Sequence, residues 1–167
     1  MVTLAVEQTE DTWEVDALFD TCFAPGRELL SSYRLRDGRQ PVSELCLIGR
    51  ESDGALAAAV RHWSVWVGGA PTLLLGPIAV HPTHQGEGLG GLLIEESAGH
   101  AADLGWDRLL LVGDLAYYRR FGFARLMHVE MPPPTNPERV LGRELSEGSW
   151  GGISGTVTAR PLKDQRA

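Results

Sequence analysis

The glycine spacing of the segment Gln85-Gly86-Glu87-Gly88-Leu89-Gly90-Gly91 is the feature of this chain that most clearly indicates chemistry. The segment follows an apolar run, Ile78-Ala79-Val80, and leads into a stretch with helical periodicity. The first N–H groups of a helix have no intrahelical partner and carry the positive end of its dipole, so a glycine-rich loop at a helix start can hold phosphate. We therefore predict a phosphate site made of backbone N–H groups, with these donors: Gly86, Gly88, Leu89, Gly90 and Gly91.

Two kinds of nucleotide-binding loop have comparable glycines. The Walker loop requires a Lys followed by Ser or Thr, and no Lys lies near this segment. The dinucleotide fingerprint G-x-G-x-x-G fits Gly86, Gly88 and Gly91, with Asp114 after a second strand-like run. However, the residues from His81 to Gln85 separate the strand from the first glycine, and the rest of the chain lacks further strand and helix crossovers. A nicotinamide-dinucleotide-binding protein therefore stays as a minor alternative.

Two motifs together resemble a known family, the GNAT superfamily of acyl-coenzyme A dependent N-acyltransferases. The run from Gln85 to Gly90 fits its hallmark Gln or Arg-x-x-Gly-x-Gly or Ala. The run from Tyr117 to Phe123 contains its Tyr-x-x-x-Gly-Phe pattern, at a spacing usual for the superfamily. The sequences of residues 76–82 and 112–114 are similar to those of small bacterial members of the superfamily. The resemblance covers roughly residues 44–123.

The resemblance implies an N-acetyltransferase that uses acetyl-coenzyme A as cosubstrate and a small-molecule or peptide amine as acceptor, with direct attack of the amine on the thioester. It also implies that the backbone of Ile78, Ala79 and Val80 faces the thioester and supplies an N–H to its carbonyl oxygen, which is oxyanion-type stabilisation. Gln85 would flank the pyrophosphate. The residues expected to contact the coenzyme are Ile78, Ala79, Val80, Gln85, Gly86, Gly88, Leu89, Gly90, Gly91, Asp114, Tyr117, Tyr118 and Phe121.

Tyr118 is the predicted catalytic residue, because it stands four residues before Gly122, where the family carries its general acid. A phenol with a reference pKa of about 10 stays protonated at neutral pH and can donate to a leaving thiolate. Tyr117 precedes it and competes for the role, and an aromatic pair beside Phe121 and Phe123 is also common in plain cores. A non-catalytic acyl-coenzyme A sensor is a second alternative, against which Tyr118 counts.

The general base and the acceptor site stay open. Candidates for the base by placement are Glu44, His62, His81 and Asp114, while a water chain can serve equally. The pair His81-x-x-His84 invites a metal site, but no third ligand has supportive spacing, so we predict a turn and no metal. Candidates for the acceptor site are Arg27, Glu28, Arg34, Arg36, Trp63 and Trp66. Arg119 and Arg120 more readily form a solvated helix surface than a phosphate contact.

The expected elements form an α/β fold with a mixed sheet. Strands are predicted at residues 2–6, 44–49, 55–66, 72–80, 108–113, 125–131 and 140–145, and helices at 11–23, 27–35 and from the glycine loop to residue 104. The three strands at residues 44–49, 55–66 and 72–80 read as an antiparallel meander, whereas the helix after the loop leads to a parallel strand through a crossover that forms the coenzyme site. One face of that helix is expected to carry Gly90, Leu93, Ile94, Ser97, Ala101 and Leu104. Residues 1–167 are expected to form a single domain, a monomer or homodimer.

The composition of the chain limits the partners and the cellular location that we expect. The 15 Lys plus Arg against 22 Asp plus Glu leave a formal net charge of −7, which argues against a nucleic-acid partner. Two cysteines without close pairing indicate no disulfide framework or thiolate metal site. Glu7, Glu10 and Asp11 stand where a signal peptide would be basic and then apolar, and no apolar run is long enough to span a bilayer. We therefore expect a cytoplasmic protein with no membrane partner.

Overall fold

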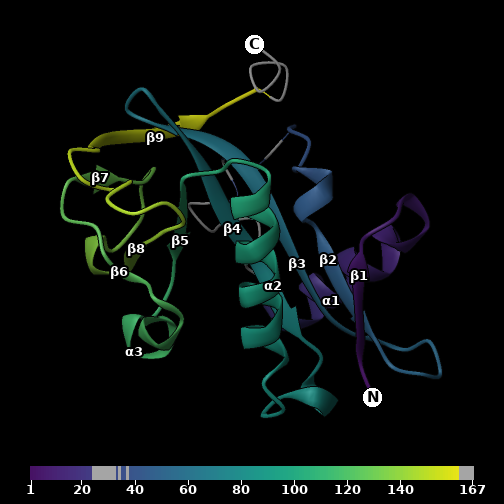
Figure 1. The fold of residues 1–167 in the computed structure, drawn as a ribbon. Helices are drawn as coiled ribbons and strands as arrows, with labels where there is room; N and C mark the ends of the chain where they lie inside the picture. The colour runs from purple at the N-terminus through teal and green to yellow at the C-terminus, as the bar shows by residue number, and fades with distance from the viewer. Residues whose placement is uncertain (24–32, 34, 37, 162–167) are drawn as a thin grey trace.

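A computed structural model describes residues 1–23, 33, 35–36 and 38–161 (Figure 1). Its strands are β1 (Thr3–Val6), β2 (Leu47–Arg50), β3 (Leu56–Val67), β4 (Ala70–Val80), β5 (Arg108–Val112), β6 (Ala124–Arg125), β7 (Val129–Glu130), β8 (Val140–Glu144) and β9 (Gly155–Ala159). Its helices are α1 (Thr12–Phe23), α2 (Leu89–Asp103) and α3 (Leu115–Tyr118). The helix predicted at residues 27–35 lies almost entirely outside the described residues.

The strands form one mixed sheet. Its order is β1-β2-β3-β4-β5-β8-β6, with β9 beside β3 and β7. The pairs from β1 to β4 are antiparallel, whereas β4 and β5 are parallel and are joined through α2. The predicted antiparallel meander followed by a parallel crossover is therefore confirmed. No helix among the described residues is both long and apolar enough to cross a membrane.

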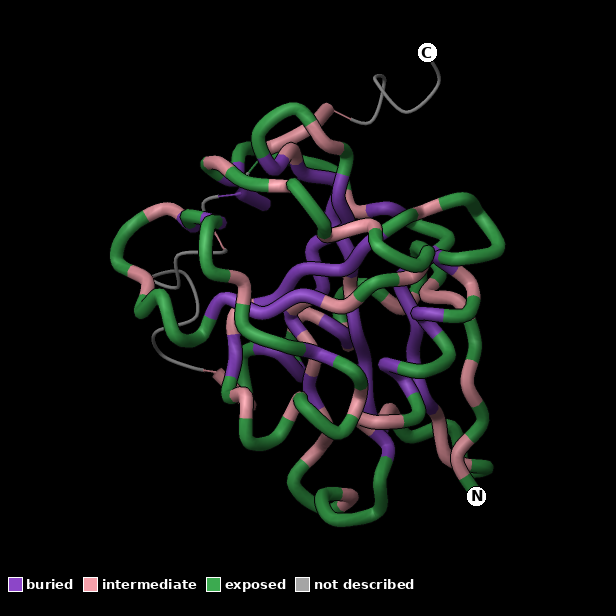
Figure 2. Tube along the Cα trace, turned by 60° about the vertical axis from the view of Figure 1, so that its left-hand side comes forward, coloured by how far each residue is buried: buried purple, intermediate pink, exposed green. Residues whose placement is uncertain are grey.

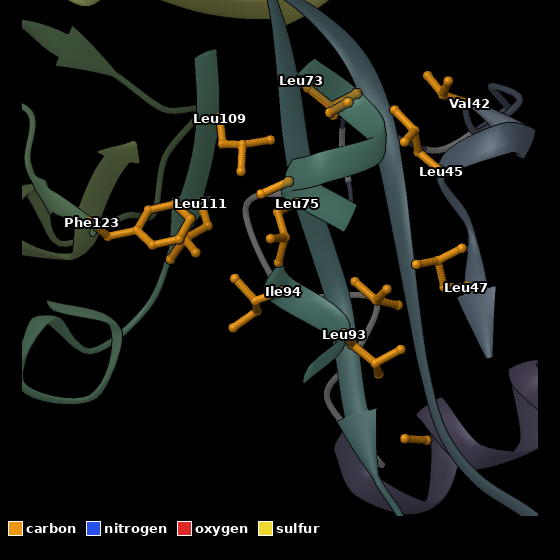
Figure 3. Packing of buried hydrophobic residues seen from close by; sticks show 14 of the residues in the cluster. Val42, Leu45, Leu47, Leu73, Leu75, Leu93, Ile94, Leu109, Leu111 and Phe123 are labelled. Atoms are coloured by element: carbon orange, nitrogen blue, oxygen red, sulfur yellow. The ribbon is translucent and has the colours of Figure 1, made fainter. Parts of the chain in front are cut away.

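The two long helices cover opposite faces of the sheet, with α2 in front of the strands and α1 behind them in Figure 1. Side chains alternate between the faces of a strand. On β3, Ala58 and Val60 accordingly belong to the core beneath α2, while Ala59 packs with Val15 and Phe19 of α1. Figure 3 shows Leu93 and Ile94 of α2 among leucines of β2, β4 and β5. Buried residues run along the central strands, and the connecting loops are mostly exposed (Figure 2).

The pairing of β4 with β5 ends before either strand does. The paired residues are Leu73 with Leu109 and Leu74 with Leu110. Beyond them, β4 continues to Val80 and remains paired with β3 on its other side. Residues 75–80 of β4 therefore present a backbone edge that pairs with no strand among the described residues. This separation of two parallel strands opens the sheet beside the glycine loop.

Several predicted boundaries were wrong for local reasons. Residues 43–45 form a 3₁₀ turn, so β2 begins only at Leu47. The strand predicted at residues 125–131 is two short strands, β6 and β7, which pair with different partners. Leu104, predicted on the buried face of α2, is exposed, because α2 ends at Asp103 and Gly105 turns the chain with φ +90°. Gly155–Ala159, for which the sequence predicted no element, form β9 against β3.

Candidate active site

The glycine loop leaves the start of α2 open. Gly88 is the N-cap residue of α2 and has φ +82°, and Gly86 has φ +87°. These left-handed conformations favour glycine. A Cβ built on either residue would meet no described heavy atom within 4 Å, so the space above the loop is open. Gly88 has no side chain to cap the helix, and the first N–H groups of α2, which lack intrahelical partners, lie beside that space.

At the two later glycines, Gly90 and Gly91, close packing and not backbone conformation favours glycine. A Cβ on Gly90 would lie 3.1 Å from the Tyr117 hydroxyl, and one on Gly91 would lie 2.8 Å from the Phe121 ring. The helix thus approaches the Tyr117 and Phe121 rings closely at these positions. Sequence reasoning assigned all four glycines to phosphate, whereas the structure divides them into two conformational positions and two packing positions.

A cavity of about 500 Å³, here called the loop cavity, lies over the glycines. Its lining residues are Val80, His84, Gln85, Gly86, Gly88, Leu89, Gly90, Gly91, Tyr117, Arg120 and Phe121. Arg120 is the cation of this lining. Its Nε donates to the Tyr117 carbonyl at 3.0 Å, and its guanidinium lies 5.0 Å from the centre of the Tyr117 ring. Sequence reasoning placed Arg120 on a solvated helix surface. The spacing of residues along the chain does not show which way the Arg120 side chain points.

The unpaired edge of β4, residues 75–80, turns backbone N–H and C=O groups away from β3. In an antiparallel pair, alternate residues turn their N–H and C=O groups toward the partner strand. The His81 N–H donates to Ala57 at 2.7 Å and Ala79 pairs with Ala59, so Ile78 and Val80 turn their groups away from β3. The Val80 carbonyl accordingly accepts from the Gln85 side-chain amide at 3.2 Å. Ala79, by contrast, lines neither this cavity nor the next, and its side chain packs in the core beneath α1.

A second cavity of about 320 Å³, here called the strand cavity, lies where β4 and β5 separate. Its lining residues are Phe23, Arg36, Leu75, Gly76, Pro77, Ile78, Leu111, Val112, Gly113, Asp114, Tyr117, Tyr118 and Arg139. Tyr117 lines both cavities. The two cavities therefore adjoin, one at the helix start and the other between the strands.

Tyr118 points into the strand cavity from α3. Its ring packs edge-on against Tyr117 at 4.9 Å and Phe123 at 5.9 Å between centroids. A Cβ on Gly113 would lie 2.5 Å from the Tyr118 ring, so glycine at this position admits the ring. Burial, with a smaller contribution from Tyr117, raises the Tyr118 pKa above its ordinary value, while Arg139 partly offsets the shift. The phenol is therefore protonated at neutral pH.

The four candidates for the general base lie in different parts of the structure, and not all of them border the cavities. His62 is fully buried, and its Nδ1–H donates to the Leu45 carbonyl at 2.6 Å. Burial lowers the His62 pKa to about 4. Neither His62 nor Glu44 lines either cavity, and Glu44 lies on a separate one beside Trp106. Asp114 lines the strand cavity, although its carboxylate also caps α3 by accepting from the Ala116 N–H at 3.0 Å.

The two loop histidines form a hydrogen-bonded turn. His81 Nδ1 accepts from the Thr83 N–H at 3.2 Å, which caps the short 3₁₀ helix Pro82–His84. His84 Nε2–H donates to the Glu51 carboxylate at 2.8 Å. Within the described part of the chain, no three His, Cys, Asp or Glu side chains are grouped to hold a metal ion.

The six residues predicted as candidates for the acceptor site do not lie together. Arg36 lines the strand cavity, whereas Arg27, Glu28 and Arg34 lie outside the described residues. Trp63 supports the wall of the cavity, because its Nε1–H donates to the Gly76 carbonyl at 2.7 Å. Trp66 lies elsewhere, with the Arg160 guanidinium 4.9 Å from its ring centre. Arg139 belongs to the site and was missed by sequence reasoning, since no local pattern marks it.

Comparison with known proteins places these motifs in a family. The model of the acetyltransferase (GNAT) family matches residues 12–123. The "Uncharacterized N-acetyltransferase YhbS" of Escherichia coli strain K12 is 27% identical over 159 residues, which cover 92% of this chain and 93% of the relative.

Solved structures agree with this match. The crystal structure of Escherichia coli YhbS in complex with CoA has a TM-score of 0.82 and 24% identity, and the match covers 95% of this chain and 89% of that one. A GNAT family acetyltransferase from Brucella melitensis in complex with acetyl-CoA has a TM-score of 0.69 and 26% identity, with 96% of both chains covered. The fold predicted from the resemblance is therefore confirmed.

Proposed function

Because the chain belongs to the GNAT family of acetyltransferases, we propose that it transfers the acetyl group of acetyl-coenzyme A to a primary amine by direct attack. One observation carries this proposal. The loop cavity at the start of α2 adjoins the strand cavity, and Tyr118 points into the latter. A ligand with a phosphate end and a reactive end matches two such neighbouring spaces.

The coenzyme is proposed to bind with its pyrophosphate in the loop cavity. Gly86 and Gly88 bring bare backbone to the phosphates, and the N–H groups of Leu89 and Gly90 at the helix start donate to them. Arg120 adds a cation at the same cavity. Support comes from the relatives, since the YhbS structure holds CoA and the Brucella melitensis structure holds acetyl-CoA. The chain's net charge of −7 does not oppose this binding, because local dipoles and Arg120 act on the phosphates at short range.

The acetyl group is proposed to lie along the open edge of β4. The N–H groups of Ile78 and Val80 face away from β3 and stabilise the negative charge that develops on the thioester oxygen. The neutral amine forms a bond to the carbonyl carbon, and the carbon–sulfur bond breaks as the tetrahedral intermediate collapses. The amine loses its proton to water or a base, and the departing thiolate takes a proton from the Tyr118 hydroxyl. Asp114 is the candidate for the base that lies at the strand cavity.

A calorimetric titration with acetyl-coenzyme A and, in parallel, NADH tests the proposal. We expect saturable binding of acetyl-coenzyme A and none of NADH. A screen of amines for release of the free coenzyme thiol then tests catalysis. Tighter binding of NADH would favour the dinucleotide alternative, whereas binding of acetyl-coenzyme A without thiol release from any amine would favour a sensor.

A further inference from the structure

A chain of hydrogen-bonded side chains runs through the turn that leads into the glycine loop. His84 Nε2 lies 2.8 Å from a carboxylate oxygen of Glu51, and His84 Nδ1 lies 3.0 Å from the Thr83 hydroxyl oxygen. The same hydroxyl oxygen lies 2.8 Å from His81 Nδ1. His84 is therefore engaged at both ring nitrogens, one toward an acid between β2 and β3 and the other toward its own turn.

The number of hydrogens available to these contacts determines the charge of His84. His81 Nδ1 accepts from the Thr83 N–H at 3.2 Å, so this nitrogen carries no hydrogen. The hydrogen between His81 Nδ1 and the Thr83 hydroxyl is then the single hydrogen of that hydroxyl. Consequently His84 Nδ1 supplies the hydrogen for its own contact with Thr83. Because an ionised carboxylate only accepts, His84 Nε2 also carries a hydrogen, and the ring is an imidazolium.

The Glu51 carboxylate stabilises this charge. It also accepts from the Met1 ammonium at 3.2 Å. Hydrogen bonds from the Met1 ammonium and from His84 lower the pKa of the Glu51 carboxyl, which is therefore ionised at neutral pH. The His84 side chain is 17% exposed, so solvent screens its charge less than that of a side chain on the open surface.

His84 lines the loop cavity, as does Arg120. The other described residues of that lining are glycine, apolar, tyrosine or glutamine, and no carboxylate is among them. When His84 is neutral, its pair with Glu51 carries one negative charge, whereas protonation makes the pair neutral. A proton on His84 therefore makes the wall of this cavity less repulsive to phosphate by one unit of charge.

We propose that His84 is a proton-dependent binding residue of the coenzyme site, whose imidazolium, held by Glu51 and Thr83, strengthens the binding of the coenzyme phosphates. The inference rests on the proposed binding of the coenzyme in the loop cavity. His84 acts through its charge, because both of its N–H groups are already bonded. Protonation of His84 and binding of the coenzyme strengthen each other by the same factor. Coenzyme affinity thus depends on pH through a residue just outside the glycine motif.

Other groups near His84 also carry or change charge, and the experiment must separate them from it. The charged and titratable groups on the elements around His84 are Glu51, the Met1 ammonium behind it, His81, Tyr117, Arg120 and, on the glycine loop, Glu87. Comparing two proteins that differ only at His84, at each of two pH values, removes the contribution of these groups. It also removes the titration of the coenzyme's own 3′-phosphate.

Calorimetric titration with acetyl-coenzyme A compares the wild-type protein with His84→Gln at pH about 6 and about 8.5, on either side of the ordinary histidine pKa of about 6.5. Glutamine keeps an N–H donor for Glu51 but has no charge. We expect the variant to bind about fivefold more weakly at the lower pH, the scale of a surface ion pair, and about equally at the higher pH. An equal ratio of the two dissociation constants at both pH values would overturn the proposal.

His100→Gln is the matched control. His100 Nε2 also lies beside a carboxylate, that of Glu96 at 3.2 Å, but His100 lines neither the loop cavity nor the strand cavity. Its variant should bind acetyl-coenzyme A as the wild-type protein does at both pH values. If His100→Gln shows the same pH-dependent weakening as His84→Gln, the effect belongs to the general surface charge and the proposal is wrong.

The wild-type protein provides a second test that does not depend on the folding of a variant. Nitrogen-15 chemical shifts of the assigned His84 ring distinguish an imidazolium from a neutral ring. Saturation with acetyl-coenzyme A should raise the pH at which His84 loses its proton by about 0.7, which is the counterpart of the fivefold change in affinity. A His84 ring that is neutral at pH about 6, or a titration that the coenzyme does not move, would contradict the proposal.

The failure of this inference differs from the failure of the proposed function. If acetyl-coenzyme A binds and the ratio of dissociation constants is independent of pH, the coenzyme site stands and the role of His84 is wrong. If acetyl-coenzyme A binds at neither pH, both are wrong.

Discussion

At the scale of single residues, Tyr118 and Tyr117 are chain neighbours with different surroundings. Tyr118 packs against Phe123 and over Gly113, and burial raises its pKa. Tyr117 is 39% exposed and lies with its hydroxyl over Gly90. The proposed acid is therefore the more enclosed phenol, at the cavity between the strands, whereas its neighbour forms the boundary of both cavities.

Tyr118→Phe should lower kcat and leave the affinity for acetyl-coenzyme A nearly unchanged, because only the hydroxyl is removed. General acid catalysis contributes about 100-fold to 10,000-fold, although a water can replace part of it. Turnover at saturating coenzyme is the measurement, and Tyr117→Phe is the internal control. If Tyr117→Phe loses turnover and Tyr118→Phe does not, the roles of the two tyrosines are exchanged. Loss of coenzyme affinity without loss of turnover would place the hydroxyl in binding.

His62 should make stability fall as the pH falls from about 6.5 toward 4. Its folded-state pKa of about 4 lies below the ordinary histidine pKa of 6.5, so over this range the unfolded chain binds a proton that the folded protein does not. Its contribution, present in full above pH 6.5, should decrease by about 2 kcal/mol between pH 7 and pH 5. Urea unfolding at both pH values measures it. His62→Asn, which keeps a donor for the Leu45 carbonyl, should show a smaller loss over the same range; an equal loss would assign the effect to other groups.

At the scale of elements, the glycine loop and the start of α2 combine two requirements. Gly86 and Gly88 have positive φ angles under open space, whereas Gly90 and Gly91 lie against the side chains of Tyr117 and Phe121. The same short segment therefore shapes the proposed phosphate site and packs α2 against α3 and the turn after it. Mutations at different glycines can therefore test binding and packing separately.

Gly88→Asp should abolish binding of acetyl-coenzyme A while the protein stays folded, because it places a negative charge where the pyrophosphate is proposed to lie. The matched control is Gly54→Asp, since Gly54 has φ +91°, equally open surroundings and a place in the turn between β2 and β3. Both changes introduce the same backbone strain and charge, so only Gly88→Asp should change the calorimetric titration. Full affinity in folded Gly88→Asp would remove the loop from the coenzyme site.

Alanine substitutions on α2 should have opposite effects on stability. Gly99→Ala should raise the free energy of unfolding by up to about 1 kcal/mol, because alanine favours helix and no described atom lies within 4 Å of its Cβ. Gly91→Ala should lower it, because its Cβ would lie 2.8 Å from the Phe121 ring. Denaturant midpoints measure both. A stabilising Gly91→Ala would show that the ring moves aside at little cost.

At the scale of the whole molecule, the sheet separates between β4 and β5, and the two cavities proposed to hold the coenzyme and its reactive end lie beside this opening. The helix α2 closes one face of the sheet and α1 the other, and Phe23 at the end of α1 reaches the strand cavity. Ligand binding at this opening should therefore stabilise the fold as a whole.

Acetyl-coenzyme A should raise the melting temperature by several degrees. A ligand at about 100 times its dissociation constant adds about 2.7 kcal/mol to the free energy of unfolding. Thermal melts with increasing ligand measure the shift, and NADH at equal concentration is the control. A larger shift with NADH, or none with millimolar acetyl-coenzyme A, would contradict the assignment.

The sequence by itself determined the features whose signals are local. The glycine motif, the tyrosine motif after it, and strand and helix periodicity are all readable along the chain, and from them the family and the mixed sheet were correctly predicted. The same reasoning predicted Leu104 on the buried face of α2, because helical periodicity does not show where the helix ends.

Only the tertiary structure decided which distant residues meet. Arg36 and Arg139 line one cavity with Tyr118 because the sheet separates after Leu74, and the Gly113 N–H holds the Arg139 carbonyl beside it. The same packing removed His62 and Glu44 from the site and put β9 against β3. These contacts join residues that lie far apart in the chain, and their geometry depends on the packing of all the layers together, which no local pattern of residues records.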